Sequence, residues 1–303
     1  MKTYLFFMLL LMSINISNAQ NIQDSIATKH SKKDSNQHKK NKIDSTTTKH
    51  WNIKGTTSLS GNQSAFSNWL NGGTSNITVN LRLNYDFNYK KDNWVLDNKF
   101  ITAYGFNRNK FSSVKKTEDK IELNSILARN IEKEWHYSFF FNFKSQFGKG
   151  LDPKDPKNKV SHFLSPIFLM TGPGIFWRKS DNFKINFSPA TPRFVFVHSE
   201  FTKMGKSFGV SQNEVHRFEF GSTVYAYYKF DIMKNVTMEN ILGLFADYTH
   251  DFSKVDIDYQ ASLYLKVNKF ISANVYYDVL YDYDTSKKLQ QKETVGIGFK
   301  YSF

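Results

Sequence analysis

Residues 77–89 read ITVNLRLNYDFNY and alternate strictly between apolar and polar side chains. The odd positions hold Ile77, Val79, Leu81, Leu83, Tyr85, Phe87 and Tyr89, and the even positions hold Thr78, Asn80, Arg82, Asn84, Asp86 and Asn88. Successive side chains on a β-strand point to opposite faces. The stretch therefore predicts a strand with one apolar face and one wholly polar face.

The same period of two returns in residues 135–144, 257–267, 271–282 and 294–303. In a soluble sandwich the apolar faces would form a core, whereas in a membrane barrel they would meet lipid and the polar faces would line the lumen. The composition favours the barrel, because aromatic residues make up 17% of the chain and yet its mean hydropathy is −0.51. Fine alternation produces such a polar average together with a continuous apolar surface.

The first residues have the pattern of an export signal. A basic start at Lys2 precedes an apolar run over residues 4–12, and the small residues Ser17 and Ala19 precede Gln20. Residues 1–19 are therefore predicted to be a secretory signal peptide, since the run is too short for a membrane anchor. No other stretch approaches the roughly 18 apolar residues of a transmembrane helix, so a mature chain in a membrane must be a closed barrel.

Residues 20–50 contain almost no large apolar residues and many Lys, Ser, Thr and His. A segment of this kind cannot bury enough surface to fold, and we predict a disordered basic periplasmic tail. Its mixture of Lys and Asp favours a solvated linker over a segment that binds a specific anionic partner.

Short and long connections alternate along the rest of the chain. Tight turns are expected at 90–93, 132–134, 179–182, 233–235 and 267–269, and longer polar loops at 63–73, 107–119, 149–160, 199–214, 251–255 and 284–291. This alternation is typical of bacterial outer-membrane barrels, which have short periplasmic turns and longer extracellular loops. Residues 51–303 are thus predicted to form an all-β, transmembrane, antiparallel up-and-down barrel of about twelve strands. Prolines interrupt residues 163–197, so a bulge or inward bend is expected there, and ten or fourteen strands remain open.

The last predicted strand has a sequence pattern that indicates the cellular location of the protein. Residues 294–303 read TVGIGFKYSF and place Phe299, Tyr301 and Phe303 on one face. This strand resembles the C-terminal strand that outer-membrane barrels present to their assembly machinery, with Phe303 as the terminal assembly signal. We therefore expect the outer membrane of a Gram-negative envelope as the location. The expected partners are the barrel-assembly machinery, outer-membrane lipid and lipopolysaccharide.

Several short blocks in order also resemble a family. They are SAFSNW at 64–69 followed by Gly72 and Gly73, EDKIEL at 118–123, SQF at 145–147, SHFLSP at 161–166, FSP at 187–189, VDID at 255–258 and KVNKF at 266–270. The family is the uncharacterised outer-membrane barrels common in Bacteroidota, classed as a domain of unknown function. The resemblance implies the location and the fold, and no activity comes with it. Residues 24–26 and 44–46 also look like the Asp-Ser sequons that such bacteria O-glycosylate.

The first of these blocks forms a motif loop with five marked residues, Phe66, Asn68, Trp69, Gly72 and Gly73. A phosphate-binding loop would open a helix, whereas this one leads into a strand, so the glycines are interpreted as turn residues. Asn68 and Trp69 are expected to anchor the loop against the barrel rim rather than to bind a ligand.

Strand parity assigns charged side chains of both signs to the lumen. The candidates are Arg82, Asp86, Lys99, Glu122, Lys144, Arg217, Glu219, Lys229, Asp258, Lys266, Asp278, Asp282 and Lys300. Eight strands leave an interior filled by side chains and sixteen leave a water channel, so a barrel of about twelve is intermediate. The leading hypothesis is a narrow pore or ligand-specific channel for an unidentified small solute. The alternative is a closed structural or surface-interaction barrel that binds envelope glycans or a partner.

A third possibility is a hydrolase at the barrel rim. The candidate residues lie near the extracellular strand ends and are His162, His198, His216 and His250, with Glu200, Glu214 and Asp251 beside them. Imidazole and carboxylate groups together can bind zinc or activate water. However, His216 shares the parity of Phe218 and His250 that of Tyr248, so both are expected at the lipid interface. We therefore assign no catalytic, metal or cofactor residue and expect a protein without enzymatic activity.

The charge balance is compatible with an envelope location. The chain carries a formal charge of +14, and Lys and Arg are frequent in the predicted long loops. Lipopolysaccharide phosphates beside the barrel explain this better than nucleic acid, which an exported protein does not meet. Cysteine is absent, which excludes disulfides and thiolate metal sites.

Overall fold

The computed structural model describes residues 50–66, 74–110, 114–152, 155, 157–250 and 252–303. The chain divides into two units, Met1–Thr48 and Lys49–Phe303, and the description below concerns the second. The predicted signal peptide, nearly all of the predicted tail, the motif residues Asn68, Trp69, Gly72 and Gly73, and Asp251 lie outside the described residues.

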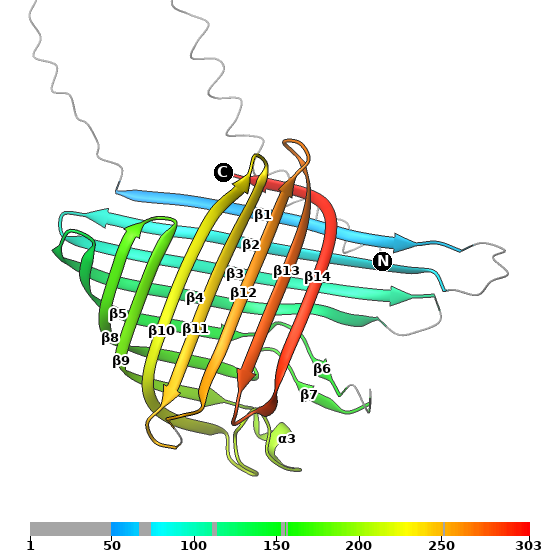
Figure 1. Ribbon diagram of the computed structural model, residues 1–303. Helices are drawn as coiled ribbons and strands as arrows, with labels where there is room; N and C mark the ends of the chain where they lie inside the picture. Colours follow the sequence, from blue (N-terminus) through cyan, green and yellow to red (C-terminus); the bar gives the residue numbers. More distant parts are fainter. Residues whose placement is uncertain (1–49, 67–73, 111–113, 153–154, 156, 251) are drawn as a thin grey trace, which may run out of the picture. The chain divides into compact units, whose positions relative to one another are not determined.

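Twelve antiparallel strands close into one barrel, in the order β1-β14-β13-β12-β11-β10-β9-β8-β5-β4-β3-β2 (Figure 1). The strands are β1 (Trp51–Ser64), β2 (Asn76–Lys91), β3 (Trp94–Asn109), β4 (Lys115–Glu132), β5 (Trp135–Ser145), β8 (Ile167–Ser180), β9 (Phe183–Phe196), β10 (His216–Met233), β11 (Val236–Asp247), β12 (Val255–Lys266), β13 (Ile271–Asp282) and β14 (Ser286–Ser302). The predicted twelve-stranded antiparallel barrel is confirmed.

The remaining described elements are small and lie between barrel strands. β6 (Gly150–Leu151) and β7 (Lys159–Ser161) form a separate two-stranded sheet, and α3 (Ser199–Thr202) is a single helical turn after β9. No helix in the described part of the chain is long and apolar enough to cross a membrane.

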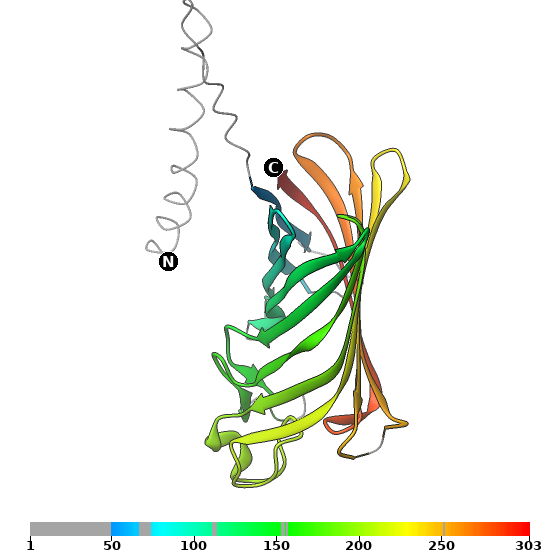
Figure 2. The same cartoon turned by 90° about the vertical axis from the view of Figure 1, so that its left-hand side faces the viewer.

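The barrel closes between its first and last strands. β1 pairs with β14 from Thr56↔Ser302 to Gly61↔Ile297, and Phe303 extends the pairing through backbone hydrogen bonds with Gly55 in both directions. The Phe303 ring also packs on Tyr85, with ring centroids 5.5 Å apart. In Figure 1 the strands β1–β4 run across the direction of β10–β14, and Figure 2 shows the same two walls turned by 90°.

One end of the barrel carries short turns and the other carries long loops. At the short-turn end, Asp92, Lys133 and Asn235 adopt positive φ of 51°, 49° and 68° in tight connections. At the long-loop end, two predicted boundaries are wrong, because β4 begins at Lys115 and β14 at Ser286. The residues predicted there as loops are polar, but polar side chains do not prevent two strands from pairing. β13 and β14 remain paired from Leu280↔Gln290 to Asp282↔Ser286.

The bulge predicted in residues 163–197 is confirmed. The register between β8 and β9 shifts between Met170 and Ile175. A Cβ on Gly172 would lie 2.2 Å from the Ala190 carbonyl oxygen, and one on Gly174 would lie 2.3 Å from that of Phe187. These glycines therefore allow a close approach of the two strands where the prolines interrupt the alternation.

The outer surface of the barrel is apolar. Trp51, Trp94 and Trp135 each begin a strand at the short-turn end and are about half exposed. The outward row of β14 includes Ile297, Phe299 and Tyr301, each more than 60% exposed. This is the reverse of a soluble barrel, in which large apolar side chains would point inward.

Candidate functional site

The interior of the barrel contains most of the buried charged side chains, and bonds between opposite walls cross it. The clearest crossing is in the middle of the strands, where Gln260 of β12 donates from Nε2 to Glu122 Oε2 of β4 at 3.0 Å. These two strands lie six places apart in the ring of twelve, so the bond spans the full width of the lumen.

Glu122 is the centre of a mid-lumen charge cluster. Its carboxylate is 1% exposed and lies 3.1 Å from Lys120 Nζ. Lys144 of β5 lies 3.9 Å from the same carboxylate and also donates to Asp258 of β12. Two lysines therefore neutralise two carboxylates from facing walls, as burial of such groups requires.

A second cluster lies nearer the short-turn end. Lys99 of β3 lies 2.8 Å from Glu239 of β11, again six places around the barrel, and 3.2 Å from Asp86 of β2. Asn84 Nδ2 also donates to Glu239 Oε1 at 3.1 Å. The Arg82 guanidinium lies over the Tyr276 ring, 4.3 Å from its centroid.

A third cluster lies towards the long-loop end and centres on Glu219, which is fully buried. Arg193 donates to it with two nitrogens, at 2.5 and 2.6 Å, and lies 2.6 Å from Asp256. Arg217 lies 3.2 Å from Glu219 and 3.9 Å from Asp282. The forked geometry of Arg193 on Glu219 is the strongest form of a buried ion pair.

Apolar side chains fill the lumen between these charges. We call this set the apolar layer; it consists of Val95, Ile101, Ile126, Ala128, Phe140, Phe176, Tyr225, Tyr227 and Ile241, all buried. Phe140 and Tyr225 project from β5 and β10 and their ring centroids lie 6.1 Å apart. Beside them is a cavity of about 20 Å³, lined among others by Glu122, Phe140 and Tyr225. That volume is sufficient for about one water molecule.

The lumen candidates from the sequence occupy different parts of this interior. The three clusters and the contacts between them hold Arg82, Asp86, Lys99, Glu122, Lys144, Arg217, Glu219, Asp258 and Asp282. Asp278 lies 2.8 Å from Lys292, which also contacts Glu118. Lys300 lies apart from the clusters, with its ammonium 4.1 Å from the Tyr264 centroid.

Sequence reasoning missed several interior residues. Arg193 follows Pro192 in the interrupted region, where the shifted register removed the parity signal. Asp97 and Lys184, paired at 2.7 Å, lie on β3 and β9, whose sequences do not alternate cleanly. The sequence does not predict the apolar layer. Tyr225 and its neighbour Val224 are both large and mainly apolar, so their order along the strand does not show that Tyr225 points into the lumen and Val224 outward.

A further contact crosses the barrel at its short-turn end. Asp181, in the β8–β9 turn, accepts from Arg178 at 2.5 Å and from Lys54 of β1 at 3.3 Å. Burial alone would raise the pKa of the Asp181 carboxyl, but Arg178 and Lys54 outweigh that effect and lower the pKa. The contact therefore joins the first strand to the opposite wall of the barrel by charge.

This link predicts a pH dependence of stability. Since the folded-state pKa of Asp181 lies below the unfolded value, the link stabilises the fold at neutral pH, and the stabilisation is lost as the pH falls through the lowered pKa, below about 4. The pair is partly exposed, so its contribution should stay below about 1 kcal/mol. We expect Asp181→Asn to lower the melting temperature slightly at pH 7 and by less at pH ~3. An equal deficit at both pH values would contradict the assignment.

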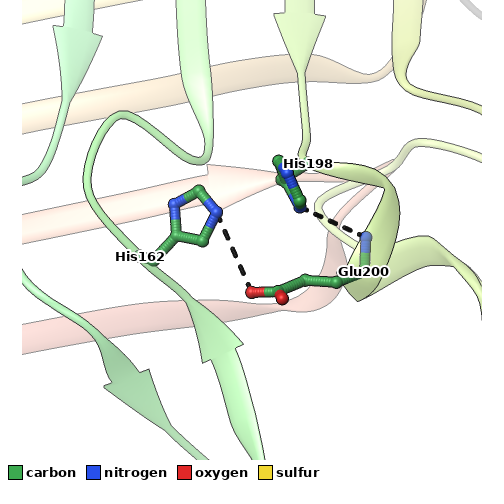
Figure 3. A group of neighbouring side chains, drawn as sticks. All are labelled: His162, His198 and Glu200. Atoms are coloured by element: carbon green, nitrogen blue, oxygen red, sulfur yellow. Dashed lines mark hydrogen bonds and ion pairs between the residues drawn. The ribbon is translucent and has the colours of Figure 1, made fainter.

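At the long-loop rim, three of the predicted rim residues meet. His162 precedes β8, His198 precedes α3 and Glu200 lies within it (Figure 3). The two imidazole centroids are 4.8 Å apart, and His162 Nε2 lies 3.8 Å from Glu200 Oε1. One ring nitrogen of each histidine and a carboxylate oxygen all lie within 4.8 Å of one another.

The other rim candidates lie elsewhere. His216 is exposed beside the Phe196 ring, on the row of Phe218. The lipid-interface position expected for His250 from strand parity is wrong, because β11 ends at Asp247 and the parity does not extend past it. His250 instead folds back, with Nδ1 2.5 Å from the Asp247 carboxylate.

Comparison with known proteins finds one family model, without an assigned activity, that matches part of the chain. Residues 61–151 match the model described as "Protein of unknown function (DUF3078)". The blocks at 64–69, 118–123 and 145–147 fall within the matched segment and the later ones fall outside it. The assignment to Bacteroidota stays a prediction. No curated protein matches the sequence.

Solved structures with a similar fold are distant. The translocator domain of the autotransporter NalP from Neisseria meningitidis is 10% identical, with 83% of this chain and 87% of that chain covered and a TM-score of 0.32. Outer membrane phospholipase A from Escherichia coli is 12% identical, with 81% and 91% covered and a TM-score of 0.36. The outer membrane channel DcaP of Acinetobacter baumannii is 12% identical, with 84% and 97% covered and a TM-score of 0.33. Likeness at this level does not indicate an activity.

Proposed function

We propose that this chain is an outer-membrane β-barrel whose lumen is closed by its own side chains, and that it acts through its long-loop surface rather than as an open diffusion pore. The short-turn end then faces the periplasm. The predicted signal peptide and the terminal Phe303 belong to the same proposal, as an export signal and an assembly signal.

The outer surface supports the membrane location. Its exposed Phe, Tyr, Ile and Leu side chains would be costly in water and are favourable in lipid. The tryptophans that begin β1, β3 and β5 stand where a bilayer interface would meet the short-turn end. The interior charges on the opposite parity complete the apolar-out, polar-in pattern of an outer-membrane barrel.

The closed state rests on one observation above all, the bond from Gln260 to Glu122 across the full width of the lumen. The Lys99–Glu239 pair makes a second crossing of the same span at another depth. The apolar layer packed beside these pairs also supports a lumen too narrow for a hydrated ion to pass. A porin would need a water-filled path instead.

A ligand-specific narrow channel is the second candidate. Every contact that crosses the described lumen is made by side chains, so a change of rotamers would open it without moving the wall. Several buried polar atoms also lack partners, including Arg82 Nε and Nη1 and both side-chain polar atoms of Asn274. Such groups are free to exchange partners when a solute enters.

Planar-bilayer recording of the purified full chain tests the proposal. The closed lumen predicts no steady ohmic conductance at neutral pH, whereas an open barrel of this size would conduct. Refolded protein of verified β content is required, with a known porin in the same lipid as a positive control. Steady conductance of the unmodified chain would overturn the closed-lumen proposal and favour the channel. Conductance only after addition of a solute would identify the ligand class of the second candidate.

A surface role predicts binding at the long loops. These loops are rich in Lys, and the alternative partner is an anionic envelope glycan or the phosphates of lipopolysaccharide. A deletion strain with unchanged permeability but altered surface binding supports the surface role. Changed permeability with unchanged binding supports the channel.

A further inference from the structure

The three residues at the long-loop rim are fixed by their backbone surroundings. The buried Ser165 accepts a hydrogen bond from the His198 backbone N–H on its Oγ, at 2.9 Å. Gln146 Nε2 donates to the carbonyl oxygens of His162 and Ser165, both at 3.1 Å. Gln146 therefore holds the loop that carries His162, and the buried Ser165 ties this loop to the segment that carries His198 and Glu200.

The side chains are also held in place. The Phe201 ring packs against both imidazoles, with centroid distances of 5.0 Å to His162 and 6.3 Å to His198. Two aromatic contacts limit the rotation of each imidazole. The rings therefore remain on the same side of the rim as the Glu200 carboxylate (Figure 3).

The hydrogen bonds of His162 select its tautomer. Nδ1 lies 2.8 Å from the Phe163 carbonyl oxygen, which can only accept, so Nδ1 carries a proton. In the neutral ring the lone pair then lies on Nε2, which faces Glu200 Oε1 at 3.8 Å. A lone pair facing a carboxylate oxygen is repulsive, and the contact becomes favourable when Nε2 binds a proton or a metal cation. A backbone carbonyl that fixes the other nitrogen is the usual support of a metal-binding histidine.

We propose that His162, His198 and Glu200 bind a divalent transition metal, with Zn²⁺ as the best fit. Two imidazoles and one carboxylate are the donor set of many zinc sites and suit Ca²⁺ or Mg²⁺ poorly. Tetrahedral Zn²⁺ with bonds of about 2.0–2.1 Å places its ligand atoms roughly 3.3 Å apart. The 3.8 Å separation of His162 and Glu200 closes to that value by a small rotation of the half-exposed Glu200 side chain.

The site would leave one coordination position for water or an external group. The proposed metal site lies at the long-loop rim, outside the lumen and away from the charge clusters of the interior. The inference is independent of whether the lumen conducts, since it concerns only the rim.

Zinc titration of the refolded full chain by isothermal calorimetry tests this inference. One Zn²⁺ per chain is expected at neutral pH, with affinity reduced at least about tenfold in His162→Ala and in His198→Ala. Glu200→Gln keeps the shape of the side chain and removes its charge, and should also weaken binding. His216→Ala is the matched control, because His216 is an exposed rim histidine outside the group, and it should bind as the unmodified chain does.

The variants separate a real site from incidental binding. Heat-modified gel mobility and circular dichroism establish that each variant is folded, and the isosteric Glu200→Gln remains informative if an alanine variant does not refold. Absence of saturable zinc binding would overturn the inference. Binding that survives both His162→Ala and His198→Ala, or that is lost equally in His216→Ala, would overturn it as well.

Discussion

Glu219→Ala is expected to lower the free energy of unfolding by about 3–5 kcal/mol, as loss of one partner of a buried ion pair does. The Glu219 carboxylate is fully buried and accepts two hydrogen bonds from Arg193, while Arg217 lies 3.2 Å away. Its removal leaves Arg193 with its hydrogen bond to Asp256, while its Nε and Nη2 donors lose their partner. The cost arises from these two buried charged donors that no longer have an acceptor.

Urea unfolding of the barrel in phospholipid vesicles measures this effect. Glu214→Ala is the matched control, because Glu214 lies exposed at the same rim and its replacement should change stability by less than about 0.5 kcal/mol. The double variant Arg193→Met/Glu219→Leu should be more stable than Glu219→Ala alone, because it removes both charges together. A loss below about 1 kcal/mol in Glu219→Ala would mean that water screens the pair, contrary to a closed lumen.

Strand parity was sufficient to predict the barrel and to select some of its buried charges, among them Arg82, Lys99 and Glu219. Glu122 and Asp258 fall on the polar face of their strands, and both lie in the mid-lumen cluster. Their meeting across the lumen was not predictable from sequence. It depends on the number of strands and on their stagger around the ring, and no local pattern encodes either.

Two further features escaped prediction for physical reasons. Inward Phe140 and Tyr225 share the parity of polar neighbours, so strand parity did not single out the rings that fill the lumen. The rim group required the folding of two loops, since His162 and His198 belong to different connections that the Ser165 hydrogen bond and the ring contacts bring together. Parity describes strands and does not extend into the loops, which is also why it failed for His250.

The second large effect concerns conduction, and it follows from the position of the apolar layer. Phe140→Ala/Tyr225→Ala removes the two facing rings that border the cavity of about 20 Å³. The charged groups that remain can hydrate and exchange partners, whereas the rings exclude water from the centre of the lumen. We expect discrete ohmic steps in planar bilayers from this variant, where the unmodified chain shows none.

The matched control replaces the same residue types on the opposite face. Phe139→Ala/Tyr228→Ala removes rings that are exposed on the outer surface, and it should leave the lumen closed. Each inward truncation should also destabilise the fold by about 3–5 kcal/mol, so conductance is compared only for protein that retains its β content. If the folded inward variant stays silent, the cross-lumen pairs Gln260–Glu122 and Lys99–Glu239 are sufficient to close the barrel without the rings. If the outward control conducts, the rings do not form the barrier, and the closure must be assigned to another part of the chain.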